Sequence, residues 1–158
     1  MPKTYHYAFK NTYLGLSKRL TTSVEIISIS GIGNNRITVN ALWDTGATSS
    51  AVTPDVARRL SLVPIGRTKV NGVNNVSMAD IVLLSVGLPN QTIIRDVHAA
   101  VCNLVKDVDL LIGMDIITTG DFCISNGEGK TLFSFAIPPF VNKTDLYEKA
   151  LAVNNRNK

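Results

Sequence analysis

The chain has 158 residues, of which 45% are hydrophobic and 18% are charged. This length suits one domain of roughly 100–150 residues, and the composition excludes disordered, collagen-like and low-complexity proteins. No apolar run approaches the roughly 18 residues that cross a bilayer, and the first residues lack the apolar region of a signal peptide. We therefore expect a cytoplasmic protein that does not contact membranes.

The formal net charge of +4 comes from the two ends of the chain. Strand-like patterning begins near Ser23 and ends at Ile137, which divides the chain into residues 1–22, 23–137 and 138–158. The first segment carries +4 with no acid, the last carries +2, and the central segment carries −2. We expect a central domain between two basic extensions.

The central segment has the pattern of an all-β protein. The second of its β-rich runs has Ile37, Val39 and Ala41 at every second position, which is typical of a strand with one buried face. The sequence predicts strands at Val24–Ile29, Arg36–Trp43, Thr68–Val73, Val76–Val86, Thr92–Val101, Phe122–Ser125 and Lys130–Ile137. Many short strands with few helices favour a closed or partly open β-barrel.

Two or three short helices accompany these strands. A helix is predicted at Thr53–Leu60. Thr53 is a good N-cap, Pro54 suits the first helical position, and two arginines lie in the last turn. A weaker helix is predicted at Met114–Thr118, and a further one begins near Thr144.

The residues with the clearest chemical pattern follow the second predicted strand. Asp44 comes directly after the apolar run and is followed by Thr45, Gly46 and Ala47. A turn of small residues presents a carboxylate at the end of a rigid strand, and Gly46 permits close backbone approach. The Thr45 hydroxyl can orient neighbouring groups.

A second motif strengthens the interpretation of Asp44. About 65–70 residues further along, Leu110, Leu111 and Ile112 form an apolar strand that enters Gly113 and a short helix. The two motifs, in this order and at this spacing, resemble those of the retropepsin-like aspartic peptidases, which include retroviral and retrotransposon proteases and bacterial relatives. The resemblance spans roughly residues 24–137 and implies the retropepsin-like fold.

The resemblance implies a role for each matching residue. Asp44 would be catalytic, Thr45 and Gly46 would support the catalytic loop, and Leu111, Ile112 and Gly113 would form the second-signature loop. The segment about 28 residues after Asp44 occupies the place of the family's flap hairpin. The residues expected to bind substrate are Ala47, Val70, Gly72 and Val73.

The reaction implied is peptide-bond hydrolysis by an aspartic endopeptidase. Two neighbouring carboxylates cannot both ionise cheaply, so they share one proton, and together they activate water and protonate the leaving nitrogen. Such chemistry requires no metal or cofactor, and we expect none. Since the chain has a single Asp-Thr-Gly motif, the resemblance implies a homodimer in which each subunit supplies Asp44.

The sequence departs from the family pattern at two positions. Met114 stands where retroviral enzymes usually have an arginine that forms an ion pair, and Trp43 is bulkier than the usual aliphatic residue before the aspartate. The acids near the second motif could in principle supply the second carboxylate within one chain, although none lies in a turn like that of Asp44; they are Asp107, Asp109, Asp115 and Asp121. Asp115 is better interpreted as a capping or orienting residue.

Two other functions stay open. One is a non-catalytic dimeric module that binds peptides or proteins with the same fold. The other is an enzyme whose basic ends tether it to nucleic acid or a polyprotein, although the chain has no interleaving of aromatic and basic residues, and we do not expect nucleic-acid binding.

Weaker motifs have simpler explanations. The Gly-Lys-Thr at 129–131 lacks the first glycine of a phosphate-binding loop and precedes a strand, so we predict a hairpin turn there. His98 and Cys102 do not make the three or four convergent ligands that a metal site needs. We expect Cys102 and Cys123 to be small buried residues.

Overall fold

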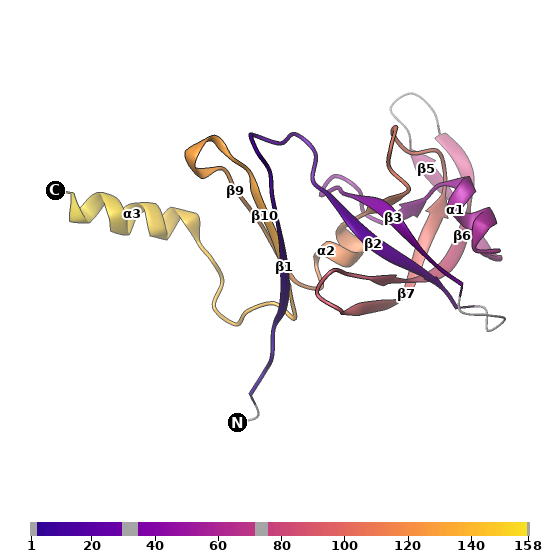
Figure 1. Ribbon diagram of the computed structural model, residues 1–158, viewed down its shortest axis with the longest axis horizontal. Coiled ribbons are helices and arrows are strands. Elements are labelled where there is room, and N and C mark those ends of the chain that lie inside the picture. The colour runs from indigo at the N-terminus through magenta and orange to yellow at the C-terminus, as the bar shows by residue number, and fades with distance from the viewer. Residues whose placement is uncertain (1–2, 30–34, 72–75, 158) are drawn as a thin grey trace.

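The computed structural model describes residues 3–29, 35–71 and 76–157 (Figure 1). Three helices lie within these ranges: α1 (Pro54–Arg59), α2 (Met114–Ile117) and α3 (Leu146–Arg156), with a 3-10 turn, η1, at Gly127–Gly129. The strands are β1 (Tyr7–Thr12), β2 (Thr21–Ser28), β3 (Arg36–Trp43), β4 (Ala51–Val52), β5 (Pro64–Asn71), β6 (Val76–Gly87), β7 (Ile93–Val101), β8 (Leu110–Ile112), β9 (Asp121–Ser125) and β10 (Leu132–Ile137).

Six of the described strands close into a barrel. Their hydrogen-bonded order is β2-β3-β8-β4-β7-β6, and β6 pairs back with β2, while β5 extends the sheet beyond β6. The pairs β3–β8 and β4–β7 are parallel, and the other barrel pairs are antiparallel. The prediction of an all-β barrel with a few short helices is confirmed.

The local patterns explain why these segments take these forms. Val39, Ala41 and Trp43 point from β3 into the core, as the period of two predicted. At α1 the Thr53 hydroxyl accepts a hydrogen bond from the Val56 amide, which satisfies a donor that the helix leaves free. The predicted helix at Thr53–Leu60 is confirmed.

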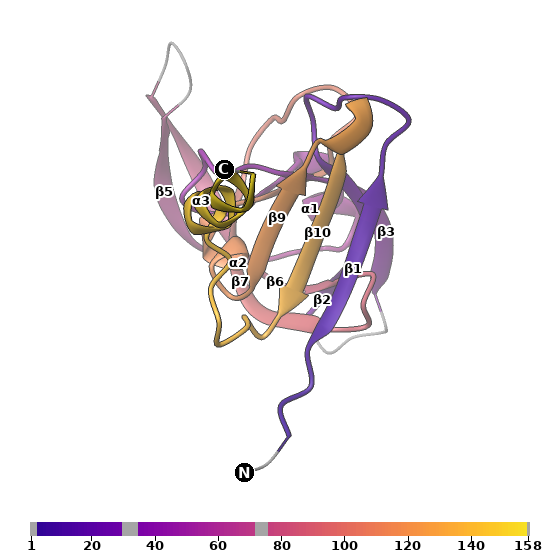
Figure 2. The same cartoon turned by 90° about the vertical axis from the view of Figure 1, so that its left-hand side faces the viewer.

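A second sheet lies beside the barrel (Figure 2). It is antiparallel, in the order β1-β10-β9, with Tyr7 opposite Ile137 and Thr12 opposite Leu132. The predicted hairpin turn is confirmed, because η1 joins the antiparallel strands β9 and β10. The strand pattern did not predict β1, which belongs to residues 1–22 and forms an edge of this sheet.

An aromatic cluster joins the barrel to the second sheet. The Trp43 ring lies 4.9 Å from that of Phe135, 5.2 Å from Phe133 and 6.0 Å from both Phe9 and Phe122, measured between ring centroids. Its indole N–H donates a hydrogen bond to the Thr22 hydroxyl. The bulky residue before Asp44 therefore fills the space between the two sheets, where an aliphatic side chain would leave a void.

The C-terminal helix has a different environment. Helix α3 extends away from the sheets (Figure 1), and none of its described residues is buried. Asp145 caps it by accepting hydrogen bonds from the amides of Tyr147 and Glu148.

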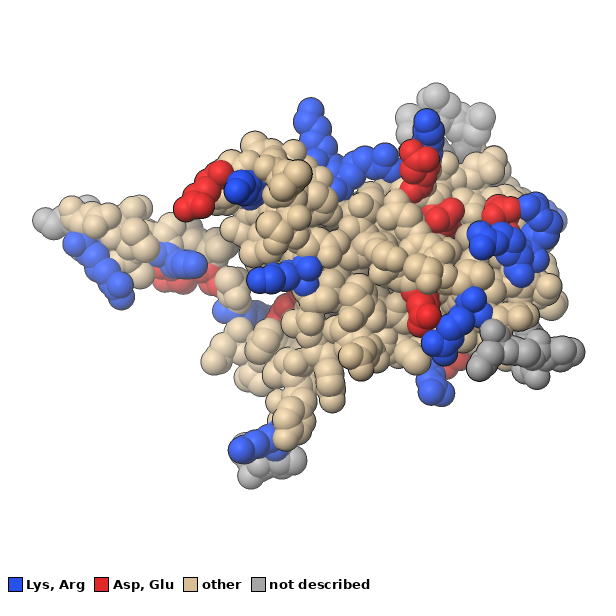
Figure 3. All heavy atoms as spheres, viewed as in Figure 1, with Lys and Arg blue, Asp and Glu red and all other residues tan. Residues whose placement is uncertain are grey.

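In Figure 3 several acidic side chains lie beside basic ones, in agreement with ion pairs such as Glu25–Arg36. Among the described residues, the helices are too short or too polar to cross a membrane.

We predict that the aromatic cluster is a major source of stability. Phe133→Ala removes a fully buried ring and should lower the free energy of unfolding by roughly 3–5 kcal/mol. Tyr147→Ala on α3 is the matched control and should change it by less than about 0.5 kcal/mol. Urea denaturation followed by Trp43 fluorescence measures both, and equal stability of the two variants would contradict the prediction.

Candidate active site

Asp44 lies where β3 leaves the barrel sheet. Its backbone amide donates to the Ile112 carbonyl at 2.9 Å, so it stays attached to the parallel strand β8. Its side chain folds back, and Oδ1 accepts a hydrogen bond from the Gly46 amide at 2.8 Å. A Cβ at position 46 would lie 3.1 Å from the same oxygen, so a larger residue there would require the carboxylate to shift by a few tenths of an ångström. The carboxylate is thus held at the end of a strand and is half-buried.

The loop after Asp44 is bonded to the second-signature loop. The Met114 amide donates to the Ala47 carbonyl at 2.8 Å, and the Asp115 amide donates to the Thr48 carbonyl at 3.2 Å. Gly113 lies against this loop, and a Cβ there would come within 2.7 Å of the Ser49 carbonyl carbon and oxygen. No side chain fits that space without a backbone shift, so glycine permits the contact.

Ser50 and Asp115 lock the two loops together. The Ser50 hydroxyl donates to Asp115 Oδ1 at 2.8 Å, and the Ser50 amide donates to Oδ2 at 3.1 Å. The Gly113 amide in turn donates to the Ser50 hydroxyl oxygen at 3.2 Å. The interpretation of Asp115 as an orienting residue agrees with these contacts. Sequence reasoning missed Ser50, because nothing in its neighbourhood indicates a partner 65 residues away.

Two cavities open beside Asp44. The first has a volume of about 560 Å³ and is lined by the loop after Asp44, by β5, and by residues that follow β7. Of the residues predicted from the sequence, the structure places Gly46, Ala47, Val70 and Leu111 on its wall together with Asp44. Gly72 and Val73 lie outside the described residues. Thr45 is exposed, whereas Ile112 and Gly113 are buried behind the loop.

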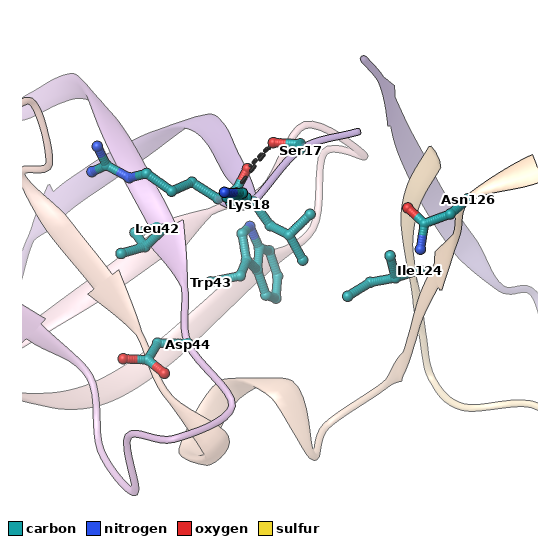
Figure 4. A pocket seen from close by; sticks show the side chains of 9 residues that line it. Ser17, Lys18, Leu42, Trp43, Asp44, Ile124 and Asn126 are labelled. Carbon is teal, nitrogen blue, oxygen red and sulfur yellow. Dashed lines mark hydrogen bonds between the residues drawn. The ribbon is translucent and has the colours of Figure 1, made fainter. Parts of the chain in front are cut away.

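The second cavity lies on the side of Asp44 that faces the three-stranded sheet (Figure 4). Its volume is about 450 Å³, and Figure 4 shows Trp43 between Lys18 and Asp44, with Ile124 and Asn126 on the opposite wall. The remaining lining residues are Ser17, Arg19, Leu20 and Leu42. Residues 17–20 therefore contribute to the surroundings of Asp44, although they precede the predicted central domain; the domain boundaries themselves stay a prediction.

Asp44 is the sole acidic residue among the described residues that line the two cavities. The carboxylates of Asp109 and Asp121 accept hydrogen bonds elsewhere, from the amides of Asn40 and Phe140. Asp107 lines neither cavity. The described part of one chain thus brings a single carboxylate to this site.

The two cysteines lie in different environments, and neither belongs to a cluster of metal ligands among the described residues. Cys102 lines the first cavity, and its partial burial raises the pKa of the thiol, which favours the uncharged form. Cys123 is exposed, so the expectation that both cysteines are buried is wrong; it lies on β9 opposite Ser134, on the outward side of the strand pair. In the ranges that the structure describes, no three His, Cys, Asp or Glu side chains gather as a metal site would require.

The sequence matches a known protein family. Residues 27–116 match a family model described as aspartyl protease. No curated protein sequence matches the chain significantly.

Two solved structures have a fold similar to that of this chain. A retropepsin-like aspartic protease from Rickettsia conorii matches with a TM-score of 0.54 and 16% identity, over 87% of this chain and 98% of that one. The EIAV protease in complex with an inhibitor matches with a TM-score of 0.51 and 25% identity, over 65% of this chain and 88% of that one.

We predict that Asp115 is needed for the stability of the two loops. Asp115→Ala leaves the Ser50 hydroxyl and amide without their acceptor in a buried place and should cost roughly 1–3 kcal/mol of unfolding free energy. Asp80→Ala is the control, because it removes an exposed ion pair with Arg67 that is worth less than about 1 kcal/mol. Chemical denaturation measures both, and a smaller loss at position 115 than at position 80 would contradict this role.

Proposed function

Because the chain belongs to the aspartyl protease family and has the retropepsin-like fold, we propose that it is an aspartic endopeptidase whose dyad consists of Asp44 from two identical subunits. The observation that carries the proposal is the setting of Asp44. Asp44 ends a strand, its carboxylate is held by the turn that follows it, and the residue lines two cavities that contain no other described acid.

The proposed chemistry follows from two carboxylates that share one proton. The ionised carboxylate accepts a proton from a water molecule, and the resulting hydroxide attacks the carbonyl carbon of the substrate amide. The protonated carboxylate donates a hydrogen bond to the carbonyl oxygen, where negative charge develops. Breakdown of the tetrahedral intermediate then transfers a proton to the leaving nitrogen. Every step uses carboxylates and water.

The second carboxylate of the dyad is more readily supplied by another copy of the chain than by another acid of the same chain, and this supports a homodimer. Asp115 is bonded to Ser50, Asp109 to the Asn40 amide, and Asp121 to the Phe140 amide. Each of these acids would have to leave a described hydrogen bond to approach Asp44. A second copy related by a two-fold axis supplies an identical carboxylate without such a rearrangement.

The remaining predicted residues have places in this proposal. Ala47, Val70 and Leu111 form part of the wall against which an extended peptide would lie. Thr45 is exposed next to Asp44 and is free to brace the partner's loop. We assign Gly72 and Val73 to a flap that covers the peptide and excludes water, since they follow β5. The Met114 side chain packs against the core in place of the usual arginine.

We predict that the Asp44 carboxylate is required for cleavage. Asp44→Asn keeps the shape of the side chain but cannot exchange a proton, so cleavage should fall by at least roughly a hundredfold between about pH 4 and pH 7. An unfolded protein serves as substrate, and cleavage is followed by gel electrophoresis and mass spectrometry. Asp80→Asn is the control and should retain wild-type activity. Equal activity of Asp44→Asn and the wild type would refute the proposal, and a wild type that binds peptides without cutting them would indicate the non-catalytic module.

We also predict that activity requires Asp44 from both subunits of the dimer. Excess Asp44→Asn chain, added to a fixed amount of wild type, should form mixed dimers that contain one aspartate. With random pairing, a tenfold excess leaves roughly one wild-type subunit in eleven with a wild-type partner, and activity should fall in proportion. Sedimentation should show the dimer directly. Full activity in the mixture, with an equal excess of an inert protein as control, would place the whole active site in one chain.

A further inference from the structure

Both cavities beside Asp44 have basic side chains on their walls. Lys18 and Arg19 line the cavity that faces the three-stranded sheet, and Lys69 lines the other. All three residues are exposed. The described surroundings of Asp44 thus carry three positive charges and one carboxylate.

The segment that carries Lys18 and Arg19 is fixed in place. The Ser17 amide donates to the Thr131 hydroxyl at 2.9 Å, and the Trp43 amide donates to the Leu20 carbonyl at 2.9 Å. Arg19 is also bound through its side chain, since Nη2 donates to the Lys106 carbonyl at 3.2 Å. These contacts attach residues 17–20 to both the barrel and the second sheet, so the backbone that carries Lys18 and Arg19 is held at this cavity.

These cations lack internal counter-charges among the described residues. The ion pairs of the described chain join Arg36 to Glu25, Arg67 to Asp80, and both arginines of α1 to Asp55. None of them uses Lys18, Arg19 or Lys69. A bound ligand with a carboxylate could therefore pair with these groups without breaking an ion pair within the described chain.

The lining of the second cavity suits an acidic side chain in a further respect. Leu20, Leu42 and Ile124 provide apolar wall beside Trp43, with the Lys18 cation at the rim. A glutamate has two methylene groups below its carboxylate, so the stem can lie on the apolar wall while the charge reaches the rim. Each cavity is also large enough to take a side chain of a bound peptide.

We propose that this site prefers peptides with an acidic side chain close to the scissile bond, with Lys18, Arg19 and Lys69 as the residues that set the preference. The proposal rests on the peptidase function proposed above and adds a substrate class to it. In a homodimer the same residues occur twice, so six cations would surround a dyad that carries one negative charge.

A matched peptide series tests the preference. Peptides that differ only in having Glu, Gln or Lys near the cleavage site are compared by kcat/KM. Glu should exceed Gln by roughly two- to fivefold for each ion pair formed, with the difference mainly in KM, because an exposed pair contributes modestly to binding. The advantage should shrink as salt is raised from low concentration to about 0.5 M, since salt screens exposed charges. Equal rates for Glu and Gln peptides would overturn the proposal.

Substitutions locate the source of the preference. Lys18→Met and Lys69→Met keep the apolar stem and remove the charge, and each should lower the Glu-to-Gln ratio by roughly two- to fivefold. Lys10→Met is the matched control, because Lys10 is an exposed lysine of β1 that lines neither cavity, and it should leave the ratio unchanged. An unchanged ratio in both cavity variants, or an equal fall in the control, would refute the assignment.

A binding measurement separates this proposal from that of the catalytic function. The same fluorescent peptides are titrated into the Asp44→Asn chain, and fluorescence anisotropy gives each Kd. Tighter binding of Glu than of Gln peptides supports the acidic preference even if no peptide is cut, in which case the peptidase proposal alone fails. Equal Kd values overturn the preference, whatever the activity of the wild type.

Discussion

The structure around Asp44 depends on the attachment of two loops that are far apart in the sequence. Backbone hydrogen bonds from Met114 and Asp115 to the loop after Asp44 are possible because Gly113 lacks a side chain. The buried Ser50 hydroxyl fills the remaining space and is satisfied by Asp115. A buried polar group without a partner would cost free energy, so the loop is stable in this arrangement and in few others.

The aromatic cluster places the second sheet next to this site. Trp43 precedes Asp44 in β3 and packs against Phe133 and Phe135 of β10, so the residue that anchors the sheet is adjacent to the candidate catalytic residue. The same packing positions the β9–β10 hairpin and residues 17–20 around the second cavity. Packing of the core and the shape of the candidate binding surface are therefore coupled in this protein.

The basic residues are distributed differently in the folded chain than along the sequence. Summed along the sequence, the excess of basic residues belongs to the two ends and suggests little about substrate. In the folded chain Lys18 and Arg19 line a cavity that Asp44 also lines, while helix α3, which carries Lys149 and Arg156, extends away from the sheets (Figure 1). An exposed charge that lines the candidate site can pair with a bound peptide, with a modest gain in binding, whereas the effect of charges beyond about 10 Å is largely screened by salt. The proposal of an acidic substrate follows from this position and not from the total.

The sequence by itself determined the features whose signals lie within a few neighbouring residues. The alternation in β3 is visible within eight consecutive residues, and the Thr53 cap of α1 and the turn at Asp44 depend on contacts between residues two or three positions apart. Tertiary structure alone decided that β1 pairs with β10, that Ser50 reaches Asp115, and that Lys18 lines a cavity with Asp44. The physical reason is that a period of two indicates which face of a strand is buried but not which strand lies next to it. That choice is made by the packing of the whole core, and here much of it depends on Trp43.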